Sequence, residues 1–226
     1  FPSSFSVNHA MGNKNMDKFL IKMGRVEKKE DLDAYHEKQE FFRRTFSEYS
    51  TLVEKVAIKF KDINIIIRPH PAEDPTHWIN LSKKYKNIIL RSKGNIASWI
   101  MGSEAVIHSS CTTGMEAFIL DIPVLSFLPY TDHEYSNQIS NSVSKVSKDF
   151  QGIISSLNQI LEKNELNNYS KLDCKNFLKP HIANLESPNS WELIAAELET
   201  LDVPKDILGR VSISYLLSLK RKLIRF

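Results

Sequence analysis

Apolar residues recur along the chain at two different spacings, and each spacing predicts a different element. From Asp31 to Phe60, large apolar residues return every three or four positions with charged residues between them, which is the pattern of an amphipathic helix. Residues 63–68, 105–108 and 124–127 form short, nearly unbroken apolar runs instead. Runs of this length and composition are typical of strands covered on both faces. They therefore predict a parallel sheet with helices packed against it.

The segments between these runs alternate in the same way. The expected helices begin at Pro75 or Thr76, at Ile96 and at about Thr113, and a further short strand is expected at 87–90. Strands and helices in regular alternation at this spacing are joined by right-handed crossovers. The fold class that follows is α/β, with a Rossmann-like parallel sheet, flanking helices and further helices toward the C-terminus.

The last third of the chain has a different pattern. We expect the run at 124–127 to be the last strand, and the polar residues 130–147 to form a loop. Helices are expected at 148–163, near 188–201 and near 209–225. The predicted organisation is a Rossmann-like core at 1–147 and a helical part at 148–226 that packs on it, forming a single domain.

Composition narrows the class of protein further. With 226 residues, 42% hydrophobic and 25% charged, the chain resembles an ordinary soluble globular protein, and a net charge of +3 gives no reason to expect nucleic-acid binding. Cys111 and Cys174 have no metal-type spacing, which favours a reduced, cytoplasmic setting. No apolar run approaches the roughly 20 residues that a membrane-spanning helix needs.

The two ends of the chain carry separate expectations. Basic residues gather at 220–225, either as a solvated helix end or as a contact with an anionic membrane surface. The second interpretation places the protein peripherally at the inner face of the cell membrane. The chain begins with Phe1 rather than Met, so we expect a piece of a longer, two-domain protein.

A turn rich in hydroxyl groups follows the strand at 105–108. It contains Ser109, Ser110, Thr112 and Thr113, followed directly by a helix. One of these hydroxyls is expected to serve as the N-cap, but four within five positions exceed what capping needs. The turn lacks the lysine and glycines of a P-loop and has no G-x-G-x-x-G pattern. We therefore expect its hydroxyl and N–H groups to contact a phosphate.

Other residues near this turn leave two interpretations open. Glu116, in the first helical turn, can reach a ribose hydroxyl or simply stabilise the helix start. Cys111 is expected to be a small buried filler rather than a nucleophile. The polar residues 132–134 are expected to line the cleft rather than bind a metal, because a metal site needs more ligands.

A second polar turn ends the strand at 63–68. Two prolines stiffen the sequence Arg68-Pro69-His70-Pro71, so His70 can donate a hydrogen bond to a phosphate and Arg68 can clamp one. The alternative is a stiff turn whose histidine satisfies backbone carbonyl groups. Asn8 and His9 follow an expected strand and are candidates of the same kind, or an ordinary polar loop. We expect this strand end and the serine-rich turn to lie side by side and hold a nucleotide phosphate.

These motifs together resemble a known group of enzymes. The Arg-Pro-His-Pro turn, the run Ser-Ser-Cys-Thr-Thr-Gly-Met-Glu-Ala and the run Asp-Ile-Pro-Val-Leu-Ser-Phe are similar to the donor-binding half of GT-B glycosyltransferases. Over residues 1–130 the chain most resembles the bacterial surface carbohydrate biosynthesis family, including its Asn-His pair after the first strand. More distantly it is similar to bacterial sialyltransferases and capsule Kdo transferases, which carry an HP and an SS motif.

The resemblance implies a function and a role for several residues. His70 and Pro71 correspond to the HP motif at the CMP part of the donor, and Ser109 and Ser110 to the serine motif that holds the donor phosphate. The reaction implied is transfer of a CMP-linked Kdo- or sialic-type sugar to a glycan acceptor in the synthesis of lipopolysaccharide or capsule. His70 would assist, the catalytic base would come from an N-terminal domain, and neither a metal nor a separate cofactor is expected.

Two other classes of function stay open at this point. A CDP-glycerol-type polyol phosphate transferase or a UDP-sugar 2-epimerase-like enzyme would use the same sheet and a similar serine-and-glutamate turn with a different nucleotide. A non-catalytic scaffold domain would use the fold alone, and the dense hydroxyl turn argues against it. Base preference distinguishes the enzymes, and loss of nucleotide binding would favour the scaffold.

Overall fold

The computed structural model describes residues 1–131, 134–164, 166–167, 169–182 and 190–200. The chain divides into two compact units, Phe1–His181 and Ile182–Phe226. In the second unit, helix α9 (Ser190–Thr200) confirms the helix expected near 188–201. The basic helix expected near 209–225 lies outside the described residues.

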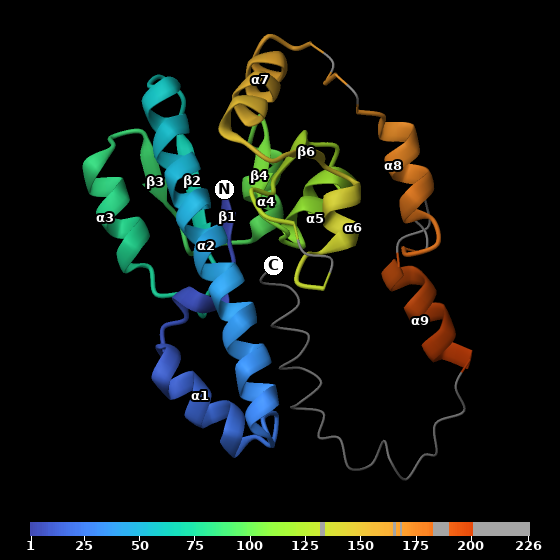
Figure 1. Ribbon diagram of the computed structural model, residues 1–226. Coiled ribbons are helices and arrows are strands. Elements are labelled where there is room, and N and C mark those ends of the chain that lie inside the picture. Colours follow the sequence, from blue (N-terminus) through green and yellow to red (C-terminus); the bar gives the residue numbers. More distant parts are fainter. Residues whose placement is uncertain (132–133, 165, 168, 183–189, 201–226) are drawn as a thin grey trace, which may run out of the picture. The chain divides into compact units, whose positions relative to one another are not determined.

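The first unit alternates strands and helices, as Figure 1 shows. Its strands are β1 (Pro2–Ser3), β2 (Ile65–Pro69), β3 (Ile88–Leu90), β4 (Val106–His108), β5 (Val124–Phe127) and β6 (Lys145–Ser147). Its helices are the 3-10 turn η1 (Ser6–Asn8), α1 (Asn13–Lys22), α2 (Lys29–Lys59), α3 (Thr76–Lys84), α4 (Ile96–Met101), α5 (Thr113–Ile119), α6 (Gln138–Ser142), α7 (Phe150–Leu161) and α8 (Lys171–Leu178).

The strands form two parallel three-stranded sheets that meet at β1 and β4. The first has the order β1-β2-β3 and the second β4-β5-β6, with every pair parallel. β1 contacts β4, and the Tyr49 hydroxyl lies 2.9 Å from the Pro2 carbonyl oxygen and 2.8 Å from that of Ile107. Across the two sheets the order is therefore 3-2-1-4-5-6, that of a Rossmann-like sheet. The strands follow one another outward in opposite directions from the junction of β1 and β4, which is the point where the strand order reverses.

One hydrophobic core joins the strands to helices α2, α3 and α7. The C-terminal half of α2 buries a helical stripe that includes Tyr49, Leu52 and Val56, because these positions recur every three or four residues. Trp78 of α3 and Ile153 of α7 are also fully buried in the unit's interior. In the N-terminal half of α2, Gln39 is hydrogen-bonded to Ser6 of η1, beyond the carboxyl end of β1. This half of α2 is therefore free to form one wall of a site at that edge.

The structure confirms the predicted α/β class and most of the predicted elements, and it corrects the expectation for residues 130–147. That segment is not a loop, because it contains α6 and a sixth strand, so 124–127 is not the last strand. Among the described strands β6 pairs only with β5, so it is an edge strand whose residues are partly exposed, and it needs no apolar run. α6 is capped at its N-terminus by Asn137, whose side chain accepts a hydrogen bond from the Ser140 N–H group.

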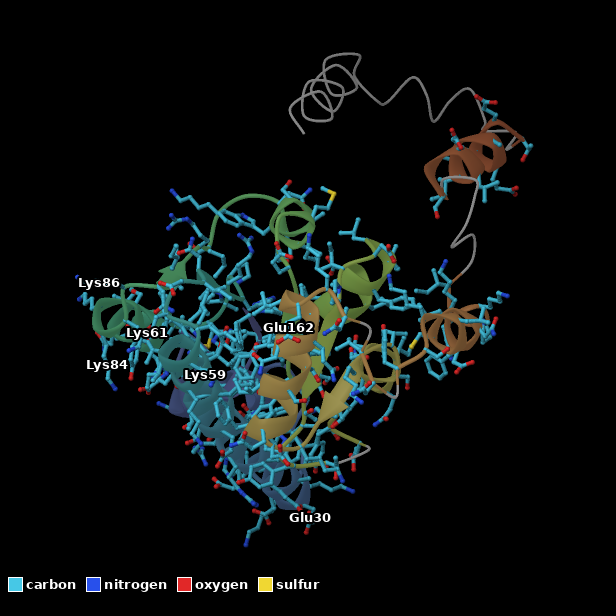
Figure 2. All side chains as sticks on the ribbon, turned by 90° about the horizontal axis from the view of Figure 1, so that it is seen from above. Glu30, Lys59, Lys61, Lys84, Lys86 and Glu162 are labelled. Atoms are coloured by element: carbon cyan, nitrogen blue, oxygen red, sulfur yellow. The ribbon has the colours of Figure 1, made fainter. Side chains whose placement is uncertain are left out.

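Charges at the ends of α2 and α3 complement the helix dipoles. Glu30 lies in the first turn of α2 and Lys59 in its last turn, and Figure 2 shows them well apart. Lys61, Lys84 and Lys86 gather near Lys59, where α2 and α3 end (Figure 2). Lys84 donates to Glu54 at 2.8 Å. Within the described part of the chain, no helix is long and apolar enough to cross a membrane.

Candidate functional site

A cavity of about 320 Å³ opens where the sheet order reverses, at the carboxyl ends of β1 and β4. Its polar lining consists of Ser4, Thr45, Ser109, Ser110, Ser136 and Asn137. Its apolar lining consists of Phe5, Phe41, Phe42, Leu128, Tyr130 and Tyr135. None of these described lining residues is acidic or basic. Open α/β sheets bind ligands at such a reversal point, so this cavity is the candidate functional site.

A buried histidine, His108, supports the turn after β4 through hydrogen bonds. The Cys111 N–H group donates to His108 Nδ1 at 3.1 Å, and His108 Nε2 lies 2.9 Å from Ser144 Oγ. The Ser144 hydroxyl in turn donates to the Ser140 carbonyl oxygen at 2.6 Å, so Nε2 is the atom that carries the ring proton. Burial lowers the pKa of His108 to about 3, which keeps it neutral. His108 is therefore a structural support of the turn.

Two positions near this histidine, Ser110 and Gly114, have unusual geometry. Ser110 has a left-handed backbone with φ of 53°, which costs energy for any residue other than glycine. Asn141 donates to Ser110 Oγ at 2.9 Å and accepts from the buried Ser126 hydroxyl at 2.8 Å. A side chain at Gly114 would put its Cβ 2.3 Å from His108 Nε2. The turn is therefore locked in place, with Ser109 and Ser110 at the cavity.

The rest of the hydroxyl-rich turn faces elsewhere. Thr112 is exposed and occupies the N-cap position, but its side chain makes no capping hydrogen bond, contrary to our expectation that one of these hydroxyls caps the helix. Thr113 is buried and lies 3.3 Å from Cys111 Sγ, which donates to it. Glu116 is half-buried in the first turn of α5. Thr112, Thr113 and Glu116 do not belong to the cavity lining.

The turn after β2 is organised around Glu73, which is only 6% exposed. One carboxylate oxygen accepts from the Ser3 hydroxyl at 2.8 Å and from the Phe5 N–H group at 3.4 Å, and the other accepts from the His70 N–H group at 3.0 Å. Burial raises the pKa of Glu73, and these hydrogen bonds partly oppose that rise. Glu73 thus ties the segment after β1 to the turn after β2.

The two histidines of this region share one geometry. His70 Nδ1 accepts from the Ala72 N–H group and His9 Nδ1 accepts from the Met11 N–H group, both at 3.1 Å. In the neutral ring the proton is therefore on Nε2, which is available as a donor. His70 is exposed and Pro71 beside it is exposed as well. His9 forms an isolated antiparallel bridge with Glu73.

Arg68 and Asn8 both bind backbone carbonyl groups. The Arg68 guanidinium donates to the Lys93 oxygen at 3.0 Å and the Gly94 oxygen at 2.9 Å, and its Cζ lies 5.7 Å from the Trp99 ring centroid. The Asn8 side chain donates to the Asp74 carbonyl oxygen at 3.0 Å. In this structure Arg68 fastens the loop before α4, and Asn8 fastens the turn after β2.

The structure gathers the predicted site residues into two groups. Ser109 and Ser110 line the cavity, whereas Asn8, His9 and His70 surround Glu73. We expected the ends of β2 and β4 to lie side by side, and this was wrong, because β1 lies between them. The segment after β1 links the groups, since Ser3 and the Phe5 N–H group bind Glu73 while Ser4 and the Phe5 ring line the cavity.

Sequence reasoning missed the aromatic side of the cavity and the role of Glu73. Phe42 recurs at the same helical spacing as the core residues of α2, so it was expected in the core, yet it lines the cavity. Phe41, Tyr130 and Tyr135 carried no signal that we recognised. The only hint was a pair of adjacent phenylalanines, because only one of two neighbouring residues can lie on the core stripe of a helix.

Asp132 and His133 lie outside the described residues, and among those described no cluster of His, Cys, Asp and Glu could hold a metal ion.

Comparison with known proteins gives a distant structural likeness. No protein-family profile matches the chain, and no curated protein sequence is significantly similar to it. Among solved structures, it is similar to the UDP-GlcNAc 2-epimerase from Neisseria meningitidis, solved bound to UDP-GlcNAc, at 17% sequence identity and a TM-score of 0.39. The match covers 58% of this chain and 39% of the epimerase chain. The function of the chain therefore has to be inferred from its own site.

Proposed function

We propose that this chain is the donor-binding domain of a GT-B-type glycosyltransferase that uses a CMP-linked acidic sugar of the Kdo or sialic type. The observation that carries the proposal is the cavity at the reversal point of the sheet, with Ser109 and Ser110 on one side and aromatic side chains on the other. Hydroxyl groups suit a phosphate, aromatic rings suit a nucleobase, and the cavity volume suits a ligand of this size.

In this proposal the protein stabilises the departing nucleotide. The acceptor hydroxyl oxygen forms a bond to the anomeric carbon of the sugar, the bond from that carbon to the phosphate oxygen breaks, and CMP leaves with the electron pair. The hydroxyl proton passes to a base outside this chain, as the family resemblance implies. Hydrogen bonds from Ser109 and Ser110 strengthen as negative charge grows on the phosphate. His70, with its proton on Nε2, is an auxiliary donor from the neighbouring turn.

The test is calorimetric titration of the chain with CMP, CDP and UDP. We expect CMP to bind and Ser109→Ala to weaken its binding about ten- to hundredfold, because a hydrogen bond to a charged group contributes about 1.5–3 kcal/mol. Ser103→Ala is the matched control, since the Ser103 hydroxyl donates to the Ile100 carbonyl oxygen and lies outside the cavity lining. His70→Ala tests separately whether the residues around Glu73 contribute to binding in addition to the serines at the cavity.

Each other outcome has a definite meaning. A preference for UDP would contradict the CMP donor and favour an epimerase-like reaction, and a preference for CDP over CMP would favour transfer of a polyol phosphate. Equal weakening by Ser109→Ala and Ser103→Ala would show that the serine turn does not hold the phosphate. Absence of binding to all three nucleotides would overturn the proposal and favour a scaffold.

A further inference from the structure

The N-terminal half of α2 presents an unusual stripe of residues. Lys38, Phe41, Phe42 and Thr45 are spaced by three and four positions, so they share one face of the helix. Three of them, Phe41, Phe42 and Thr45, line the cavity. One turn further on, Phe46 packs instead against Phe5 and Trp78 in the interior. This face of α2 thus lines the cavity up to about residue 45 and packs in the core after it.

Aromatic rings form a continuous group on this side of the cavity. The Phe41 and Tyr135 ring centroids lie 5.6 Å apart, those of Phe42 and Tyr135 6.4 Å apart, and those of Phe41 and Phe42 5.5 Å apart. Phe41 and Phe42 stay partly exposed although burial of such rings is strongly favourable. Rings held together at the edge of a cavity provide a surface on which a planar ligand can stack.

Two cations stand beside the tyrosines of the cavity. The Arg44 guanidinium carbon lies 4.2 Å from the Tyr130 ring centroid, and Lys38 Nζ lies 5.6 Å from the Tyr135 ring centroid. Within the described part of the chain, neither cation forms an ion pair with a carboxylate, whereas the adjacent Arg43 pairs with Glu40. With no acid in the cavity lining, this positive charge favours an anionic ligand.

We propose that the N-terminal half of α2 is the recognition wall of the site, the part that selects the ligand. In it, Phe41 and Phe42 with Tyr135 stack on the planar base of a nucleotide, and Arg44 binds an anionic group that the nucleotide carries. This rests on the proposed function, and it adds which residues select the ligand and which chemistry they select. The anionic group is a phosphate or a sugar carboxylate, two sources of the same charge, and the experiment distinguishes them.

The stacking arm compares Phe41→Leu with Phe177→Leu, a change at a partly exposed phenylalanine on α8. Both variants are titrated with cytidine and with CMP, and their thermal midpoints are recorded. We expect Phe41→Leu to weaken both ligands by about tenfold, because leucine removes one of the rings on which the base stacks. Phe177→Leu should leave both affinities unchanged. A merely structural role of Phe41 would lower the thermal midpoint without this loss of affinity.

The charge arm compares Arg44→Gln with Arg43→Gln, one position away on the same helix. If Arg44 binds the phosphate, Arg44→Gln weakens CMP about five- to tenfold and leaves cytidine unchanged. If it binds the sugar carboxylate, the loss appears with CMP-N-acetylneuraminate and not with CMP. Arg43→Gln should change none of these affinities. Raising the salt concentration should reduce the effect of Arg44→Gln.

The outcomes separate this inference from the proposed function. If the wild-type chain binds CMP while Phe41→Leu and Arg44→Gln both keep its affinity within twofold, the recognition wall is overturned and the donor site survives. An effect of Phe41→Leu alone overturns the anionic contact and supports the stacking. If the wild-type chain binds none of the ligands, both the site and its recognition wall are overturned.

Discussion

The turns after β4 and β2 each depend on one buried ionisable side chain, and the two side chains work in opposite ways. His108 supports the β4 turn as a neutral ring, with a backbone donor on one nitrogen and a serine hydroxyl on the other. Glu73 supports the β2 turn as an acceptor for three donors from two segments. His108 is in addition packed closely against Gly114, whereas Glu73 acts through its hydrogen bonds.

This difference predicts opposite responses to pH. The pKa of His108 is lowered in the folded protein, so acid favours the unfolded chain, which takes up the proton more readily. The pKa of Glu73 is raised, so the folded protein takes up that proton first and acid favours folding at this position. Acid therefore lowers the stability of the turn after β4, which carries Ser109 and Ser110, but not that of the turn after β2, which carries His70.

The largest effect is expected where the packing around His108 is broken. In Gly114→Ala the new Cβ would lie 2.3 Å from His108 Nε2, so the ring must leave its position and lose its bonds to Cys111 and Ser144. We expect a loss of about 3 kcal/mol in the free energy of unfolding, from overpacking and unsatisfied buried groups. Urea denaturation measures it.

Gly102→Ala is the matched control for this change. Its Cβ would meet the Ser98 carbonyl oxygen at 3.5 Å, which is ordinary contact, so the variant should stay close to wild type. Adding His108→Ala to Gly114→Ala should cost much less than His108→Ala alone, because the alanine methyl already displaces the ring. Strict additivity of the two changes would contradict the packing account.

A second prediction uses the pH dependence of stability. His108 takes up a proton at pH 6.5 in the unfolded chain and at about 3 in the folded one. Its contribution to stability is complete above pH 6.5 and falls by about 1.4 kcal/mol per pH unit below it, hence by about 2 kcal/mol at pH 5. His108→Gln should be less stable at pH 8 and lack this loss. Parallel stability curves for the two proteins between pH 8 and 5 would contradict it.

The sequence predicted those parts of the fold whose signals are local. The β-branched run of β2 and the three- and four-residue recurrence in α2 were recognisable because each is decided by neighbours along the chain. β6 was missed because an edge strand needs no apolar run, and its place depends on β5, which lies 18 or more residues earlier. The residue types therefore predicted the buried strands and helices well, but they did not predict the edge strand β6.

The same distinction applies to the candidate site. Ser109 and Ser110 were recognisable because strand, turn and helix adjoin in the sequence. Glu73 was not, since an acidic residue in a turn reads as solvent-exposed, and its partner Ser3 is 70 residues away. The side of the cavity that α2 supplies was missed for a related reason, because only the tertiary arrangement shows where the α2 stripe leaves the core.

A third prediction concerns Glu73. In Glu73→Gln the amide oxygen can keep the Ser3 and Phe5 donors, but the amide NH₂ faces the His70 N–H group, so one bond becomes donor against donor. We expect about 1–2 kcal/mol of destabilisation at pH 7.

The pH dependence of Glu73→Gln distinguishes it from the histidine. The deficit should grow as the pH falls through the raised pKa of Glu73, because only the wild type gains from binding that proton. Glu104→Gln, at an exposed carboxylate, is the control. A deficit that shrinks in acid would show that Glu73 is held as a carboxylate with a lowered pKa.

The smallest expected effect is at Tyr49, which joins the two regions. Burial raises the pKa of its hydroxyl, so the group stays protonated, and its one proton is shared between the Pro2 and Ile107 carbonyl oxygens at the junction of β1 and β4. Tyr49→Phe leaves both carbonyls without this donor, and we expect a loss of about 1 kcal/mol and faster amide exchange in β1 and β4. Tyr85→Phe, at a half-buried hydroxyl bound to Glu54, should cost less. If the two variants lose equally, β1 and β4 are held by the core around them, and the turns on either side are independent supports of the cavity.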